Sequence, residues 1–93
     1  MQKEQTMPKL IAKEEIAQYK IIPAFVDNTL QWKSKLAYAV RLGNEFKGKT
    51  HITFETTEGP RSVETTIWSH TDTHLHLKGG TLIPLESIID IHF

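Results

Sequence analysis

The stretch HITFE at residues 51–55 decides the fold class, because polar and apolar residues alternate along it one by one. A period of two places Ile52 and Phe54 on one face of a β-strand and their polar neighbours on the other. The residues before Lys49 lack this period and are rich in Ala, Lys, Glu and Gln, which favour helix. The sequence therefore predicts a switch from helix to β-structure near Lys49.

Residues 49–93 continue the β-pattern to the end of the chain. The dipeptide GP at 59–60 marks a turn, GG at 79–80 marks a tight hairpin, and Pro84 ends a short strand. Residues 86–87 form a brief break before a closing strand over 88–93. Five strands at regular spacing after a helix predict a strongly bent, antiparallel small β-barrel capped by N-terminal helix. The predicted core residues are Ile52, Phe54, Val63, Ile67, Leu75 and Leu77.

Two helices are predicted ahead of the strands. The first begins near Pro8, which suits the first turn of a helix, and ends at about Lys20. The second covers residues 30–42, places Trp32, Leu36 and Val40 on one side, and stops at the GN pair of residues 43–44. We expect one domain over residues 1–93: an N-terminal helical and extended arm (1–28), a helix (29–46) and the barrel (49–93).

Composition excludes several classes of protein. Lys plus Arg and Asp plus Glu number eleven each, so no net charge favours nucleic acid or an anionic membrane. The balance hides a basic first half, with eight Lys/Arg against five acids, and an acidic second half, with three against six. The absence of Cys rules out disulfides and thiolate chemistry. No apolar run resembles a signal peptide or a membrane span, so we expect a cytoplasmic protein without a cofactor.

The stretch DTHLHLKGGTLIPLESI at residues 72–88, together with the helix before it, resembles the small barrels of the SH3 and Sm-like type. The resemblance covers residues 29–93, and the chain also resembles a group of short, uncharacterised bacterial proteins. Within the Sm-like pattern Lys78 and Gly79 match a basic-residue–Gly step, and Asp72 lies near an acidic position. Sm-like proteins form rings and bind RNA, but the Asn that holds a base in that family has no counterpart here. Nucleic-acid binding is therefore an alternative hypothesis, through Lys33, Lys35, Arg41, Lys47 and Lys78.

A cluster of titratable residues lies at spacings of two: His70, Asp72, His74 and His76. On one continuous strand the four side chains would share a face, and imidazole and carboxylate are ordinary zinc ligands. Two residues of strand span nearly 7 Å, however, so a straight strand cannot wrap all four around one ion. A metal site and a solvated strand face both remain open. No serine occurs in a Gly-x-Ser-x-Gly motif, and we predict no enzymatic activity.

Apolar residues outside the predicted core indicate an interaction surface. Trp68 falls on the side opposite Ile67, so it either faces outward or lies beneath the helix. Residues 21–26 form an apolar arm that packs on its own barrel or on a neighbour's, and the closing strand is an edge. We therefore predict a non-catalytic interaction module that forms a homo-oligomer. Its candidate interface residues are Trp68, Ile21, Ile22, Phe25, Val26, Ile89, Ile91 and Phe93.

Overall fold

The computed structural model describes residues 9–24, 29–46 and 48–92, with the backbone alone described for 29–31, 33–34 and 43–46. These ranges contain an α-helix, α1 (Thr29–Phe46), and two 3₁₀ helices, η1 (Lys13–Gln18) and η2 (Leu85–Ser87). The strands are β1 (Lys9–Leu10), β2 (Thr50–Thr56), β3 (Gly59–Thr65), β4 (Ile67–His70), β5 (His74–Leu77), β6 (Leu82–Pro84) and β7 (Ile88–His92).

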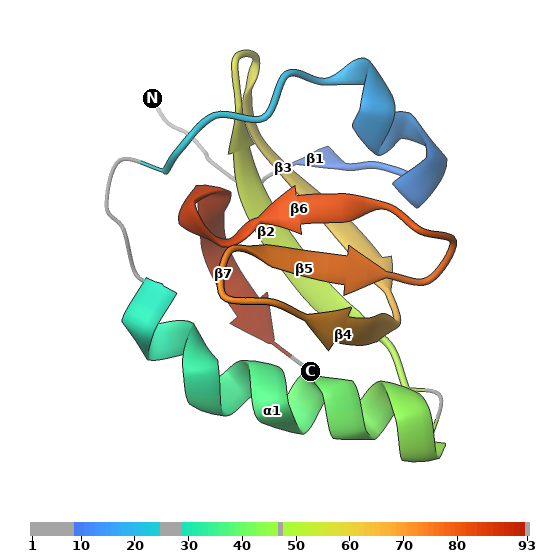
Figure 1. The fold of residues 1–93 in the computed structure, drawn as a ribbon. Helices are drawn as coiled ribbons and strands as arrows, with labels where there is room; N and C mark the ends of the chain where they lie inside the picture. The colour runs from blue at the N-terminus through green and yellow to red at the C-terminus, as the bar shows by residue number, and fades with distance from the viewer. Residues whose placement is uncertain (1–8, 25–28, 47, 93) are drawn as a thin grey trace, which may run out of the picture.

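The strands form two open sheets, one in front of the other in Figure 1. The four-stranded sheet has the order β1-β3-β2-β7, and the three-stranded sheet has the order β4-β5-β6. β1 runs parallel to β3, whereas every other strand pairing is antiparallel. Helix α1 (green) lies along β4 and β7, and η1 lies at the opposite end of the molecule.

The predicted helix-capped, five-stranded closed barrel is therefore wrong. Seven strands occur in the described ranges, no strand ladder joins the two sheets there, and α1 follows β1 in the chain and lies beside two strands instead of capping a barrel. One physical reason is Pro84, which has no N–H to extend a ladder beyond the end of β6. The chain then turns through η2, so β6 and β7 belong to different sheets.

Thr66 marks the corner at which the chain passes from one sheet to the other. It lies outside both flanking strands, and its carbonyl oxygen accepts a hydrogen bond from the Lys78 backbone N–H at 2.9 Å. Its hydroxyl donates to the Gly48 carbonyl oxygen at 3.2 Å. These two contacts replace the ladder at the bend, because a buried backbone polar group needs a partner.

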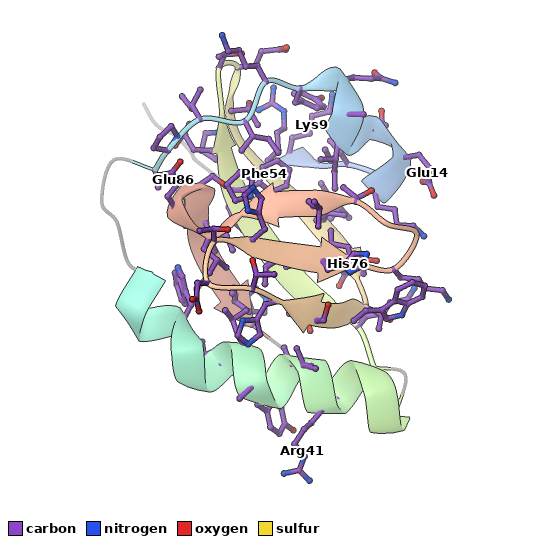
Figure 2. All side chains as sticks on the ribbon, viewed as in Figure 1. Lys9, Glu14, Arg41, Phe54, His76 and Glu86 are labelled. Carbon is purple, nitrogen blue, oxygen red and sulfur yellow. The ribbon has the colours of Figure 1, made fainter. Side chains whose placement is uncertain are left out.

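The interior between the sheets is the predicted core. All six predicted core residues are fully buried and belong to one hydrophobic cluster, so that prediction is confirmed. Phe54, in the middle of the four-stranded sheet, is the largest of the fully buried side chains and lies between the sheets in Figure 2. The described chain adds further buried residues that were not predicted: Ile11, Ile16, Ala39, Ile83, Leu85, Ile88 and Ile91.

Helix α1 contributes Trp32, Leu36 and Val40 to this core, as its apolar spacing predicts. The helix runs over residues 29–46, the range expected for it in the division of the chain, and it continues through residues 43–44, where the local stop signal is wrong. The helix predicted from Pro8 to Lys20 is also wrong within the described residues. Residues 9–10 pair with β3, and only residues 13–18 are helical, in 3₁₀ geometry with Ile16 buried.

Candidate functional site

The outer face of the three-stranded sheet presents a row of side chains that we call the Trp68 row: Trp68, His76 and Leu82. His76 is the register partner of Ser69 on β4 and of Leu82 on β6. The register shifts between Ile67 and Ser69, so the bulge sets Trp68 beside His76. The Trp68 and His76 rings meet edge to face, with 6.1 Å between their centroids.

Within the Trp68 row Trp68 and Leu82 are exposed and His76 is half-buried, while the inward residues of the same strands are buried. Trp68 is 44% exposed and Leu82 is 54% exposed, whereas Ile67, Leu77 and Ile83 have no accessible surface. The alternation that predicts Trp68 on the outer side therefore holds; its role in an interface stays a prediction. Sequence reasoning missed Leu82, although its alternation with the buried Ile83 was a usable signal.

The predicted histidine cluster is divided by a turn. His70 ends β4 and His74 begins β5, while Asp72 lies in the exposed turn between them. His74 Nδ1 is 2.9 Å from the Thr73 hydroxyl, and His76 Nδ1 is 3.4 Å from the Ser69 hydroxyl. Among the residues that the structure describes, no three His, Cys, Asp or Glu side chains are placed to hold one metal ion. Because a turn separates β4 from β5, the four side chains do not lie on one face of a continuous strand, as the sequence pattern had suggested.

Ser69 and His76 resemble part of a nucleophile–base pair but lack its geometry. Their separation of 3.4 Å is longer than the roughly 2.6–3.2 Å of an activated nucleophile, and both atoms lie at the exposed surface. Among the residues that the structure describes, the His76 ring contacts Ser69 and Trp68 and no carboxylate that would orient it. The pair therefore offers a weak hydrogen bond on the sheet surface.

The predicted basic residues do not converge on one surface of the described chain. The Lys35 ammonium donates to the Ile91 carbonyl oxygen at 3.1 Å and lies 5.4 Å from the centre of the Trp32 ring. Arg41 points away from the sheets on the far side of α1 (Figure 2), and Lys78 lies in the β5–β6 turn. The side chain of Lys33 and the whole of Lys47 lie outside the described residues.

The N-terminal arm is packed against its own chain in the part that the structure describes. Ile22 N–H donates to the Glu55 carbonyl oxygen at 3.1 Å, and Ala24 N–H donates to the Glu86 carbonyl oxygen at 2.9 Å. Ile21 forms an antiparallel bridge with Thr56 and is half-buried, as is Ile22. Phe25 and Val26 lie outside the described residues.

The closing strand β7 is divided between core and surface. Ile91 is fully buried, so its side chain packs in the core and is not available to a partner. Ile89 points outward and is partly exposed, and Phe93 lies outside the described residues. Helix α1 lies beside β7, and its Lys35 ammonium donates a hydrogen bond to the Ile91 carbonyl oxygen.

The outer face of the four-stranded sheet also carries side chains that contact one another across strands, and here they are polar and titratable. The His51 and His92 rings are register partners and stack with centroids 4.6 Å apart. Glu64 lies 3.8 Å from His51 Nδ1, and Asp90 lies 3.0 Å from His92 Nδ1. Sequence reasoning did not foresee this grouping, since it depends on the register of three strands.

Comparisons with protein-family models, with curated proteins and with solved structures give no match to this chain. The resemblance to Sm-like proteins accordingly stays a prediction. Within the described ranges, no helix has both the length and the apolar character needed to cross a membrane.

Proposed function

We propose that this protein is a non-catalytic interaction module that self-associates through the outer face of its three-stranded sheet. The observation that carries the proposal is the Trp68 row, in which an exposed tryptophan and an exposed leucine flank one imidazole across three neighbouring strands. Tryptophan is enriched among the residues that contribute most of the binding energy at protein interfaces, and Leu82 adds apolar area beside it. The proposal includes the cytoplasmic location that the sequence predicts.

The absence of charge on this sheet favours a second copy of the chain as the partner. No residue of β4, β5 or β6 is Lys, Arg, Asp or Glu. A two-fold symmetric contact places the same patch on both subunits, so like charges near the axis would face one another. A face built from Trp68, His76 and Leu82 contains no Lys, Arg, Asp or Glu that would cause that repulsion. Charged side chains are also a common protection against sheet association, and these strands lack them.

The described contacts of the arm bear on how association occurs. Residues 20–24 hydrogen-bond to β2, to the turn after it and to η2 of their own chain. Exchange of this segment between subunits would have to break those bonds first. The proposed contact therefore uses the sheet face, which is exposed without any rearrangement.

Sedimentation velocity tests the proposal. The wild-type chain is expected to have at least twice its monomer mass of 10.7 kDa at concentrations up to about 1 mM, in low and high salt alike. Trp68→Ala and Leu82→Asp are expected to return it to the monomer. Leu10→Asp is the matched control, because Leu10 is 57% exposed but belongs to the other sheet.

Two outcomes contradict the proposal. A wild-type chain that stays monomeric over this range has no such interface. An oligomer that survives Leu82→Asp but is lost with Leu10→Asp associates through the four-stranded sheet instead. Circular dichroism of each variant separates loss of association from loss of fold.

A further inference from the structure

A cleft of about 340 Å³ opens at the edge of β3. It exists because β1 is short: Lys9 and Leu10 pair with Arg61 and Ser62, and the rest of β3 has no neighbour on that side among the described strands. Four segments surround the gap, namely the start of η1, the residue before β2, the end of β3 and the β5–β6 turn. The residues that line it are Ala12, Lys13, Glu14, Lys49, Glu64, Thr65, Thr66 and Lys78.

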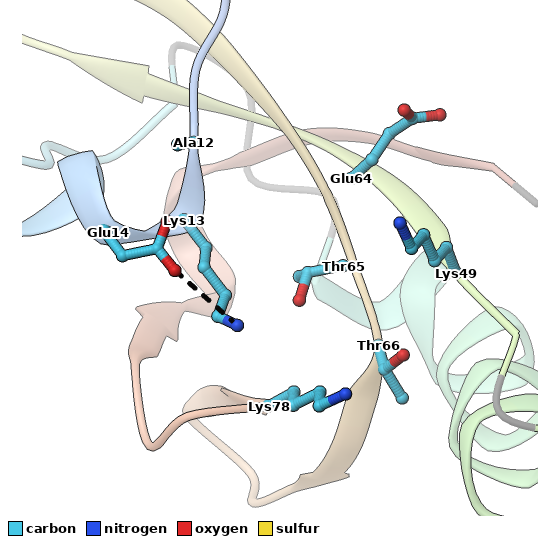
Figure 3. A pocket seen from close by; sticks show the side chains of 8 residues that line it. All are labelled: Ala12, Lys13, Glu14, Lys49, Glu64, Thr65, Thr66 and Lys78. Carbon is cyan, nitrogen blue, oxygen red and sulfur yellow. Dashed lines mark ion pairs between the residues drawn. The ribbon is translucent and has the colours of Figure 1, made fainter.

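Three lysines from three different segments line this cleft. In Figure 3 the side chains of Lys13 and Lys78 extend toward the space beside Thr65 and Thr66, whereas Lys49, which also lines the cleft, lies on the other side of β3 near Glu64. Lys13 is half-buried, whereas Lys49 and Lys78 are exposed, and an anion in the cleft would be attracted by the charges of all three. The arrangement is therefore typical of a site for a negatively charged ligand.

Three lysines and two glutamates line the cleft, so its formal net charge is +1. Glu14 lies 3.8 Å from the Lys13 ammonium, but its side chain is largely exposed, so the pair is weak. Glu64 points away from Lys13 and Lys78 in Figure 3, and its carboxylate lies 3.8 Å from His51 on the outer face of the sheet. Within the described residues, neither Lys49 nor Lys78 forms an ion pair.

The neutral residues of the cleft indicate which anion fits. Thr65 is nearly buried, and in the described part of the chain no hydrogen bond occupies its hydroxyl, which can therefore donate to a ligand oxygen. The lining contains no aromatic side chain on which a base could stack. Ammonium and hydroxyl donors around a small polar space suit the several oxygens of a phosphate group.

Gly79 allows Lys13 to reach this position. Its φ is +93°, and a Cβ atom built there would lie 3.3 Å from Lys13 Cε. The bare backbone of the β5–β6 turn thus supports the alkyl part of the Lys13 side chain. This contact joins two segments that are 66 residues apart (79 − 13).

We propose that this cleft binds the phosphate groups of a small phosphorylated molecule, with Lys13, Lys49 and Lys78 as cationic contacts and Thr65 as a hydrogen-bond donor. The site is separate from the Trp68 row and does not depend on self-association. A small ligand fits better than a nucleic acid, because the described basic residues of α1 do not line the cleft and extended nucleic-acid sites need a continuous basic track.

Isothermal titration calorimetry with pyrophosphate at low ionic strength tests this proposal, since screening is then weak. The wild-type chain is expected to bind pyrophosphate, and inorganic phosphate more weakly. Lys78→Gln is expected to lower the affinity for pyrophosphate by about tenfold or more, the effect of one charge-assisted hydrogen bond. Lys78→Arg should retain most of the affinity. Lys9→Gln is the control, because it removes an exposed lysine that does not line the cleft.

The contradicting results are equally specific. No heat of binding with pyrophosphate overturns the proposal, and so does an equal loss of affinity in Lys78→Gln and Lys9→Gln, which would show general charge attraction. Binding of a single-stranded RNA oligonucleotide without binding of pyrophosphate overturns it in favour of a nucleic-acid surface. Sedimentation of Lys78→Gln keeps the two hypotheses apart, since loss of pyrophosphate binding should leave the oligomeric state unchanged.

Discussion

The two sheets share one core but present different faces to solvent. The strands of the four-stranded sheet contain five charged residues, namely Lys9, Glu55, Arg61, Glu64 and Asp90. The strands of the three-stranded sheet contain none. On the first sheet His51 and His92 stack, and Thr53 hydrogen-bonds to Ser62 at 2.9 Å. On the second sheet Trp68 and Leu82 are exposed to water.

This difference shows that the same alternating pattern can serve two purposes. In the four-stranded sheet the polar outward residues find partners on neighbouring strands, although Leu10 at its edge is 57% exposed. In the three-stranded sheet the outward residues contribute apolar area that association could bury. The inner faces determine the fold, and the outer faces distinguish the sheets.

The largest expected effect tests whether both sheets depend on one core. Phe54→Ala removes a fully buried ring from the four-stranded sheet and should lower the free energy of unfolding by about 3–5 kcal/mol. Both sheets should then melt together in thermal unfolding followed by NMR. Separate transitions for β2 and β5 would show that the two sheets are independent units.

A smaller effect is expected from the buried hydroxyl pair. Thr53→Val leaves the Ser62 hydroxyl without its partner on a buried surface and should cost about 1–3 kcal/mol in urea denaturation. Ser69→Ala, on the exposed face of the other sheet, should change stability by less than about 0.5 kcal/mol. Equal effects of the two changes would remove the contrast between the faces.

The two hairpin glycines offer a matched comparison, because replacing either one with alanine should lower the free energy of unfolding by about 1–2 kcal/mol. Gly59 and Gly79 both have positive φ, at +103° and +93°, so an alanine at either position should be destabilising by about that amount. Only Gly79→Ala should also weaken pyrophosphate binding, because its Cβ would press on Lys13. An equal loss of pyrophosphate affinity in Gly59→Ala would mean that Lys13 is not held by the turn.

The smallest expected effect concerns Leu82. Leu82→Thr keeps β-propensity at an exposed position and should alter the monomer's free energy of unfolding by no more than about 0.5 kcal/mol. Thermal denaturation of a dilute sample measures this change. A larger loss would assign Leu82 a structural role in the monomer and weaken the case for an interface.

Sequence reasoning located the core and the β-structure after Lys49 because burial imposes a local period, but it missed β1 and the break between β3 and β4. Ile52 and Phe54 are fully buried as the alternation predicts, and the GG hairpin at residues 79–80 has the positive φ that only glycine adopts easily. The division into two sheets was not predictable in this way. A break at Thr66 and a short strand before Pro84 leave the local pattern of a barrel unchanged.

Of the two candidate sites, the local sequence pattern predicts part of the Trp68 row but not the cleft at the edge of β3. Alternation was enough to place Trp68 on the outer side of its strand. β1 has only two residues and no detectable period, so neither its pairing with β3 nor the cleft beyond it could be inferred. Lys13, Lys49 and Lys78 are far apart in the sequence, and only the tertiary fold brings them to one cleft.

An NMR dilution series on the ¹⁵N-labelled wild-type chain tests the proposed function most directly. Raising the protein concentration should shift the amide signals of Trp68, His76 and Leu82, while those of Thr53 and Ser62 on the other outer face stay in place. Shifts confined to the four-stranded sheet, or spectra that do not change with concentration, would contradict self-association through the Trp68 row.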